Sequence, residues 1–409
     1  MSYRRVSLED ISIRMFSGGT PSRKEEEYWE NGNIPWLKTN QIGQYKIYET
    51  DEHITQDGLD KSSAKIVKKN SLTVAMYGDG ITRGKVSIVG ENLTTNQACC
   101  NIELDESKAI YNFVYYALKD KYTELRHISN GGAQQNLSVG LLKKFEISLP
   151  VLEVQKQFSS ILCCLDEKIE TNNQINIKLQ KMAQTIFKQW FVDFDFPNEE
   201  GLPYKSSSGE MVDSELGMVP KAWKIRRLNE IIDNVKVNTK PGEHLKDRKY
   251  IPIDTMPMKS VTIKEFRSYE DAKSSLILFE KFDILIGAMR VYFHRVNLSP
   301  FKGVTRTTSF VLRSKKKRDI AYNLFLLDLD ETINYADRTS KGTTMPYAIW
   351  ENGLGNMKII HPTKEIRNMF NNTVLTMLEK MVVNADENRH LQDIRDTLLP
   401  KLMNGEINL

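Results

Sequence analysis

The chain has 409 residues, enough for two or three domains that each bury a core of their own. Its content of 40% hydrophobic and 27% charged residues is ordinary for a soluble globular protein, and no run of about 18 apolar residues could cross a membrane. The four cysteines and six histidines show neither redox nor metal-ligand spacing, and the first residues lack the apolar core of a signal peptide, so we expect a cytoplasmic protein without a metal site.

The net charge of +4 is unevenly distributed along the chain. Residues 1–149 are neutral, with 19 Lys and Arg against 19 Asp and Glu, whereas residues 218–358 carry 26 against 16. An excess of ten positive charges in one segment indicates a surface that binds polyanions, although a merely solvated basic surface would give the same count.

The first predicted elements are short strands separated by Gly, Asn and Asp turns in residues 1–149, with a helical stretch at 111–122. Residues 150–197 then predict one long helix, because marked positions alternate in steps of four and three as in a coiled-coil seam. The seam consists of Phe158, Leu162, Leu165, Ile169, Asn172, Asn176, Leu179, Ala183, Ile186 and Trp190.

The second half of the chain repeats this plan after a linker at 198–213, with a globular segment at 214–358 and a final helix within 359–409. Adding 212 to each seam position gives a second seam, in which Arg395 at the Ala183 position is the departure. That seam consists of Phe370, Val374, Met377, Met381, Asn384, Asn388, Leu391, Arg395, Leu398 and Leu402. The shared offset indicates an internal duplication.

Two asparagines interrupt the middle of each seam. If the two helices pack antiparallel, Asn172 faces Asn388 and Asn176 faces Asn384, and sliding would bury unpaired amides, so the polar layer would set the register. Parallel packing would also align them, and the asparagines could instead face solvent. We favour antiparallel packing because two like halves in one chain can close around a pseudo-two-fold axis.

Four stretches, in order along nearly the whole chain, resemble the specificity (S) subunits of type I restriction–modification enzymes. They are SGGTPSRKEEEYWENGNIPWLKTNQI (17–42), LPVLEVQKQF with the following helix to 197, SELGMVPKAWKIRRLNEI (214–231) and HPTKEIRNMF through LLPKLMNGEI (361–407). The second domain lacks a counterpart of TPSR…YW, so residues cannot be transferred between the early loops of the two domains.

The resemblance implies an α+β fold: two pseudo-symmetric α/β target-recognition domains, separated by two long antiparallel coiled-coil helices. It also implies a non-catalytic subunit that reads a bipartite, asymmetric double-stranded DNA target. Two modification (methyltransferase) subunits and further restriction subunits would then methylate adenine and cleave DNA. S-adenosylmethionine, ATP and Mg²⁺ would belong to those partners, with no cofactor in this chain.

Residues that could read DNA must come from loops, where Arg and Lys pair with guanine or phosphate and Asn and Gln with adenine. For each one, an ordinary exposed polar residue is an equally good interpretation. The candidates near turns are Lys38, Thr39, Asn40, Arg83, Lys85, Gln134 and Gln135 in the first domain, and Arg290, Arg306, Lys341, Thr343 and Thr344 in the second.

Two other classes of protein are alternatives to this interpretation. A nucleic-acid enzyme acting alone is disfavoured, because GDGITRGKV (78–86) has the wrong glycine spacing for a phosphate loop and Val86 replaces the Ser or Thr that would bind Mg²⁺. A coiled-coil scaffold with degenerate recognition domains would lack salt-sensitive DNA affinity. The aromatic stretch WFVDFDFP (190–197) would either be buried against a recognition domain or dock a partner.

Overall fold

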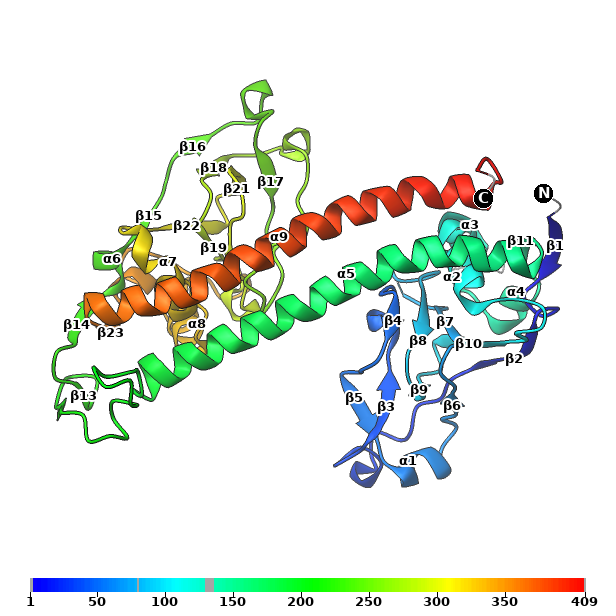
Figure 1. Ribbon diagram of the computed structural model, residues 1–409, viewed down its shortest axis with the longest axis horizontal. Coiled ribbons are helices and arrows are strands. Elements are labelled where there is room, and N and C mark those ends of the chain that lie inside the picture. The colour runs from blue at the N-terminus through cyan, green and yellow to red at the C-terminus, as the bar shows by residue number, and fades with distance from the viewer. Residues whose placement is uncertain (1–2, 79–80, 129–135, 408–409) are drawn as a thin grey trace. The chain divides into compact units, whose positions relative to one another are not determined.

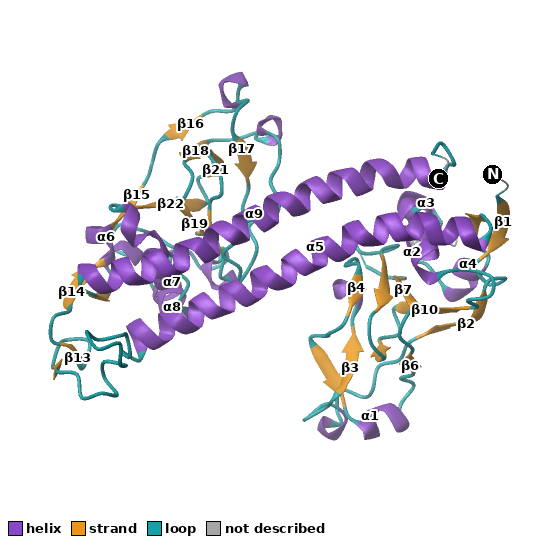
Figure 2. Cartoon of the chain, in the orientation of Figure 1, coloured by secondary structure: helices purple, strands orange, loops and turns teal. Residues whose placement is uncertain are grey.

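A computed structural model describes residues 3–78, 81–128 and 136–407 (Figure 1). The chain divides into two compact units, one formed by residues 1–170 and 390–409 and the other by residues 171–389. Each unit contains strands, short helices and parts of both long helices, α5 (Leu152–Phe187) and α9 (Lys364–Met403) (Figure 2). No described helix is both long and apolar enough to span a membrane.

The first unit contains two main sheets and one strand pair. The larger sheet has the order β2-β10-β7-β8-β4, and the smaller has the order β5-β3-β9-β6. The bounds of the larger sheet are β2 (Ser12–Ser17), β10 (Cys99–Leu104), β7 (Leu72–Ala75), β8 (Val86–Val89) and β4 (Lys46–Ile47). Those of the smaller are β5 (Glu52–Ile54), β3 (Ile34–Leu37), β9 (Leu93–Thr95) and β6 (Ile66–Val67), and β1 (Arg4–Ser7) pairs with β11 (Glu146–Leu149).

Helices cover the larger sheet of the first unit, because their apolar side chains share its core. The fully buried residues Phe113, Tyr115 and Tyr116 of α2 (Tyr111–Asp120) pack in one cluster with Phe158 of α5 and Leu402 of α9. The short helices of this unit are α1 (Gln56–Asp60), α3 (Tyr122–His127) and α4 (Val139–Lys143), with 3₁₀ turns η1 (Glu26–Tyr28) and η2 (Thr39–Gln41).

The second unit repeats most of this arrangement in two sheets of four strands, without counterparts of the edge strands β4 and β5. One sheet has the order β15-β22-β19-β20 and the other has the order β16-β18-β21-β17. Their bounds are β15 (Ile232–Asn234), β22 (Ser309–Ser314), β19 (Ile284–Gly287), β20 (Val296–Leu298), β16 (Asn238–Thr239), β18 (Leu276–Phe279), β21 (Gly303–Arg306) and β17 (Lys249–Ile251). The pairs β12 (Met211–Val212) with β13 (Val219–Pro220) and β14 (Lys224–Arg227) with β23 (Lys358–His361) complete it.

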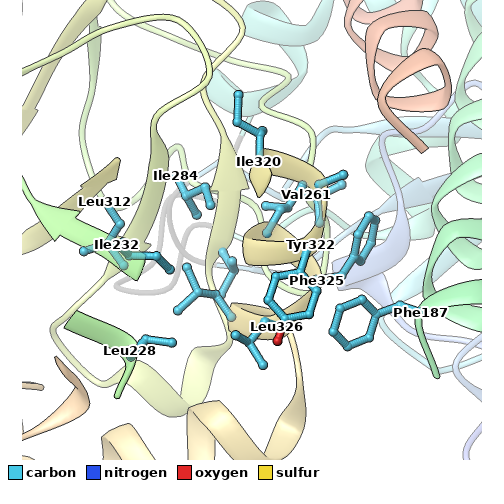
Figure 3. Close-up of a cluster of buried hydrophobic side chains, with 14 of the residues drawn as sticks. Phe187, Leu228, Ile232, Val261, Ile284, Leu312, Ile320, Tyr322, Phe325 and Leu326 are labelled. Carbon is cyan, nitrogen blue, oxygen red and sulfur yellow. The ribbon is translucent and has the colours of Figure 1, made fainter. Parts of the chain in front are cut away.

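The core of the second unit joins its first sheet to α7 (Ile320–Leu327) and to the facing ends of the long helices (Figure 3). The remaining helices are α6 (Leu228–Ile231) and α8 (Asp330–Arg338), with 3₁₀ turns η4 (Glu243–Leu245), η5 (Tyr269–Asp271), η6 (Val291–Phe293), η7 (Lys317–Asp319) and η8 (Leu354–Asn356). The α-helical part of α5 ends at Phe187, earlier than the seam predicts, and one π-helical turn, Lys188–Val192, follows it. Aromatic residues in and after this turn are buried: Phe191, Phe194 and Phe196 are all packed in this core around Trp223.

The two units repeat one topology, which is the structural counterpart of the 212-residue offset. The hairpin β7–β8 corresponds to β19–β20, and the strand pair β1–β11 corresponds to β14–β23. In both units a four-stranded sheet contains a parallel strand pair, β3 with β9 in the first and β17 with β21 in the second, and β4 with β8 is a further parallel pair in the larger sheet of the first unit. This repetition confirms an α+β fold built from two sheet-containing domains and two long helices.

The long helices run antiparallel within the second unit, and the asparagines meet there in the predicted pairs. Asn172 Nδ2 donates to Asn388 Oδ1 at 2.9 Å, and Asn384 Nδ2 donates to Asn176 Oδ1 at 2.8 Å. All four residues are buried, at 0–7% exposure, which excludes the solvent-facing alternative. The role of this layer in setting the register stays a prediction.

Within the first unit, the two long helices contact each other through the residue that interrupts the second seam. Arg395 Nη1 of α9 forms an ion pair with Asp166 Oδ1 of α5, whose side chain is 2% exposed. The Tyr116 hydroxyl donates to the other carboxylate oxygen of Asp166 at 2.8 Å. A charged side chain is therefore tolerated in the seam because a buried carboxylate faces it.

Candidate nucleic-acid interface

Three loops of the second unit converge at the end of β19. The Ala288 N–H donates to the Thr308 carbonyl at 2.9 Å, and the Ala348 N–H donates to the Ala288 carbonyl at 2.8 Å. These bonds join the loop after β19, the loop between β21 and β22, and the loop that follows α8. Strand pairing thus brings together residues that are up to 60 positions apart in the sequence.

The converging loops carry most of the residues predicted to bind DNA in this domain. The Arg290 N–H donates to the Pro346 carbonyl at 2.8 Å, and Lys341 and Tyr347 exchange two backbone hydrogen bonds of 2.9 Å. The five predicted residues of this domain all face solvent: Arg290, Arg306, Lys341, Thr343 and Thr344. Among the described residues, Arg290, Arg306 and Lys341 have no ion-pair partner, so their charges are available to a ligand.

A pocket of about 480 Å³ lies among the same loops. Its lining includes Met289, Thr308, Met345 and Tyr347, and Trp350 lies at its buried side. Exposed Met345 and Tyr347, at 52% and 49%, give this basic surface an apolar part that could contact base edges or methyl groups.

The first unit joins its loops by an equivalent set of backbone bonds. The Asn96 N–H donates to the Leu37 carbonyl at 3.0 Å, the Met76 N–H to the Ala98 carbonyl at 2.8 Å, and the Leu137 N–H to the Met76 carbonyl at 3.0 Å. Lys38, Thr39 and Asn40 follow β3 directly and therefore lie beside this cluster, in and next to η2.

An acidic residue organises the basic side chains beside Lys38. Glu52 forms ion pairs with Lys38 and with Arg23, whose guanidinium lies 3.5 Å from the centre of the Trp29 ring. Although burial acts in the opposite direction, the bonds from Lys38 and Arg23 lower the pKa of Glu52, so this carboxylate stays charged. Lys38 is thus neutralised in part, which leaves Thr39 and exposed Asn40 as the polar groups free to meet a ligand.

The other candidates of the first domain do not join this cluster. Arg83 Nη2 donates to the Arg126 carbonyl at 3.2 Å, which directs it toward α3. Lys85 lines a groove of about 420 Å³ with Tyr115 and Lys119 of α2 and Leu399 of α9. Gln134 and Gln135 lie outside the described residues.

Sequence reasoning missed several residues of these surfaces. Arg23 and its stacking on Trp29 were not singled out, nor were exposed Tyr292 and Tyr347 beside the basic residues of the second domain. The available signal was the alternation of basic and aromatic residues in RVYFHR (290–295), which is typical of nucleic-acid surfaces.

Comparisons with known proteins agree with this geometry. A family model described as the type I restriction modification DNA specificity domain matches residues 3–181. The specificity subunit of the type I restriction enzyme MjaIX from Methanocaldococcus jannaschii is 29% identical over 98% of this chain and 93% of that protein. The specificity subunit of the HindI enzyme from Haemophilus influenzae is 23% identical over 99% of both chains.

The chain belongs to the type I restriction–modification specificity subunits. It supplies DNA target specificity within such a system. The crystal structure of the S subunit from M. genitalium has the same fold, with a TM-score of 0.59 at 17% identity over 98% of this chain and 96% of that one. Within the described residues of this S subunit, no group of three or more His, Cys, Asp or Glu side chains could hold a metal ion.

Proposed function

We propose that this S subunit reads a bipartite, asymmetric double-stranded DNA target and directs adenine methylation and restriction by its partner subunits in the cytoplasm. The recognition domains are assigned to residues 1–149 and 214–358, the spacer helices to 150–197 and 359–409, and the linker to 198–213. The observation that supports two readers is the strand topology that occurs twice, with loop clusters in corresponding places.

The two loop clusters differ in their chemistry, which supports an asymmetric target. The second presents the unpaired cations Arg290, Arg306 and Lys341, whereas the first presents Thr39 and Asn40 beside a lysine that is paired with Glu52. Arginine side chains suit guanine edges and phosphates, and asparagine suits adenine, so two different half-sites are expected. Thr343 and Thr344 are assigned to phosphate or base edges of the second half-site.

The partner subunits are assigned from the family. Two modification subunits, with S-adenosylmethionine, would methylate adenine in the bound target, and restriction subunits, with ATP and Mg²⁺, would cleave DNA. The long helices would set the gap between half-sites, because a helix of about 40 residues extends roughly 60 Å.

The decisive experiment is a genome-wide map of methylated adenines in the host, with and without this gene. Loss of one split, asymmetric motif is the expected result, and an unchanged map would contradict the proposal. Two double variants then test the assignment of domains: Arg290→Ala with Lys341→Ala should degrade one half of the motif, and Thr39→Ala with Asn40→Ala the other.

A matched control is Lys317→Ala, which removes an exposed cation beyond the opposite end of β22 from the second loop cluster. It should leave both halves of the motif intact. If a double variant in one domain altered both half-sites, or if Lys317→Ala had the same effect as the variants in the loops, the two-reader assignment would be wrong.

A further inference from the structure

The short segment from Arg290 to His294 has an unusual backbone. The 3₁₀ turn η6 lies between these two residues, and both have left-handed backbone angles, with φ of +50° at Arg290 and +54° at His294. Left-handed conformations are unfavourable for residues with a side chain, so contacts elsewhere must hold this segment in place. Arg290 is one of the unpaired cations of the second loop cluster, and His294 is the anchor at the other end.

The imidazole of His294 is buried, at 7% exposure, and both of its nitrogens face acceptors. Nε2 lies 3.0 Å from the carbonyl oxygen of Asp328 and 3.0 Å from its carboxylate Oδ1, and Nδ1 lies 3.3 Å from Asp330 Oδ1. Carbonyl and carboxylate oxygens only accept, so Nε2 must carry a hydrogen to bond Asp328, and the ion pair of Nδ1 with Asp330 forms only when the ring is protonated. Only the imidazolium form of histidine has hydrogens on both nitrogens.

The residues around this ring connect it to the rest of the second unit. Asp328 ends α7 and is itself buried, and Gln184 of α5 donates to its second carboxylate oxygen at 2.8 Å. Two cations belong to the same neighbourhood: Lys259, whose backbone N–H donates to the His294 carbonyl at 2.8 Å, and Arg295, whose Nε donates to the Met256 carbonyl at 3.0 Å. The two carboxylates that contact the ring directly therefore dominate its environment.

We propose that protonated His294 is a positioning residue for DNA readout: clamped between Asp328 and Asp330, it holds the η6 segment so that Arg290 is presented to the second half-site. The inference rests on the proposed assignment of Arg290 to that half-site. When the ring loses a proton, it loses its contact with one of the two carboxylates. The η6 segment is then no longer held, and Arg290 no longer faces the second half-site.

The sign of the expected pH dependence follows from the same contacts. The hydrogen bond to Asp328 raises the pKa of His294 above its ordinary value, against the opposing effect of burial, and the charges of Asp328 and Asp330 act in the same direction as that bond. The clamp is therefore complete at low pH and is lost as the pH rises through the raised pKa. Readout of the second half-site should weaken over that rise.

The first unit supplies an internal control. The positions 212 residues before His294 and Asp328 hold Thr82 and Tyr116, so this domain has no titrating clamp there. Burial, followed by the charge of Asp166, raises the pKa of Tyr116, which keeps this hydroxyl neutral at every pH of interest. Readout of the first half-site should not show the same pH dependence.

The test uses the S subunit assembled with its modification subunits, and DNA duplexes altered in one half-site at a time. Discrimination is the ratio of the affinities for the intact and altered duplexes, measured from pH 6 to pH 9 at constant salt. For the second half-site we expect the wild type to lose about tenfold in discrimination, the order of one base contact, as the pH rises. In His294→Gln the discrimination of the second half-site should have the low value of the wild type at high pH throughout the range. The discrimination of the first half-site should not change with pH in either protein.

Two further variants separate the possible failures. Arg290→Ala should lower the discrimination of the second half-site by about tenfold and make it independent of pH; if it has no effect, the assignment of Arg290 is wrong and the proposal fails with it. If Arg290→Ala acts as expected but His294→Gln keeps both the wild-type discrimination and its pH profile, the proposed function stands and the positioning role is refuted.

Asp330→Asn covers the case in which the His294 variant does not fold. The Asp330 side chain is 85% exposed, so its replacement should leave the unit folded, and the lost charge should shift the midpoint of the pH profile to lower pH. An unchanged midpoint in this variant would overturn the proposal.

Discussion

The ion pair between Asp166 and Arg395 gives the sharpest test of how the two long helices pack within the first unit. The corresponding positions in the second unit, 212 residues away in each case, hold Leu378 and Ala183, which are 2% and 0% exposed in its core. The two units thus have a charged pair and an apolar pair of residues at corresponding positions of the long helices. The perturbation is to give the first unit the apolar pair, Asp166→Leu with Arg395→Ala.

The structure sets the magnitudes. Arg395→Ala leaves the Asp166 carboxylate buried with the Tyr116 hydroxyl alone, and an unpaired buried charge costs about 3–5 kcal/mol. Asp166→Leu should cost less, because Arg395 Nε also bonds Asp396 Oδ1 at 2.8 Å, and the Asp396 side chain is 60% exposed. The free energy of unfolding of the double variant should lie within about 2 kcal/mol of the wild-type value. An apolar pair replaces the ion pair, and the remaining loss arises because the Tyr116 hydroxyl has no acceptor.

The assay is hydrogen exchange of the amides in α2 and in residues 152–170, which reports the first unit separately from the second. A double-mutant cycle with both single variants gives the coupling energy, expected at about 2–3 kcal/mol. Adding Tyr116→Phe to the double variant should recover the part of the stability loss that is caused by the unpaired Tyr116 hydroxyl. If the losses in the two single variants simply add in the double variant, the two residues are not coupled and the reasoning is refuted.

Two other predictions concern buried polar groups of the second unit. Asn172→Leu with Asn388→Leu should raise the melting temperature while loosening the helix register, because Asn172 Oδ1 is buried and accepts no hydrogen bond among the described residues. Engineered cysteine pairs along α5 and α9 would report the register. A large loss of stability in the double variant would contradict the paired layer. Burial, with the charges of Arg367, Arg226 and Lys316, lowers the pKa of His361 to about 3, so the unfolded chain binds the proton more readily and acid should destabilise this unit. When the pH is lowered from 6.5 to 4.5, the free energy of unfolding in urea should therefore fall by about 1–2 kcal/mol less in His361→Gln than in the wild type. An equal fall in both proteins would show that the pKa of His361 does not differ between the folded and unfolded states.

The parts of the candidate site that the sequence anticipated are those governed by local chemistry. Arg290, Lys341, Thr343 and Thr344 were chosen because they lie near turns, and the structure places them in one loop cluster. Lys85 and Arg83 met the same criterion, yet they face α2 and α3, because the hairpin between β7 and β8 packs against these helices. Turn chemistry predicts that a residue is in a loop but not which neighbour the loop meets.

The sequence by itself determined the duplication, the two helical seams and the place of two asparagines in the middle of each seam. Each of these features follows from the spacing of residues along one helix or from one constant offset in the sequence. In an α-helix, residues spaced by three and four positions lie on one face, so the spacing alone predicts which face is apolar. The tertiary structure alone decided that Asp166 would compensate Arg395, that Glu52 would neutralise Lys38 and that His294 would lie between two carboxylates. These contacts join residues from separate elements, and only strand pairing and helix packing bring such residues within hydrogen-bonding distance.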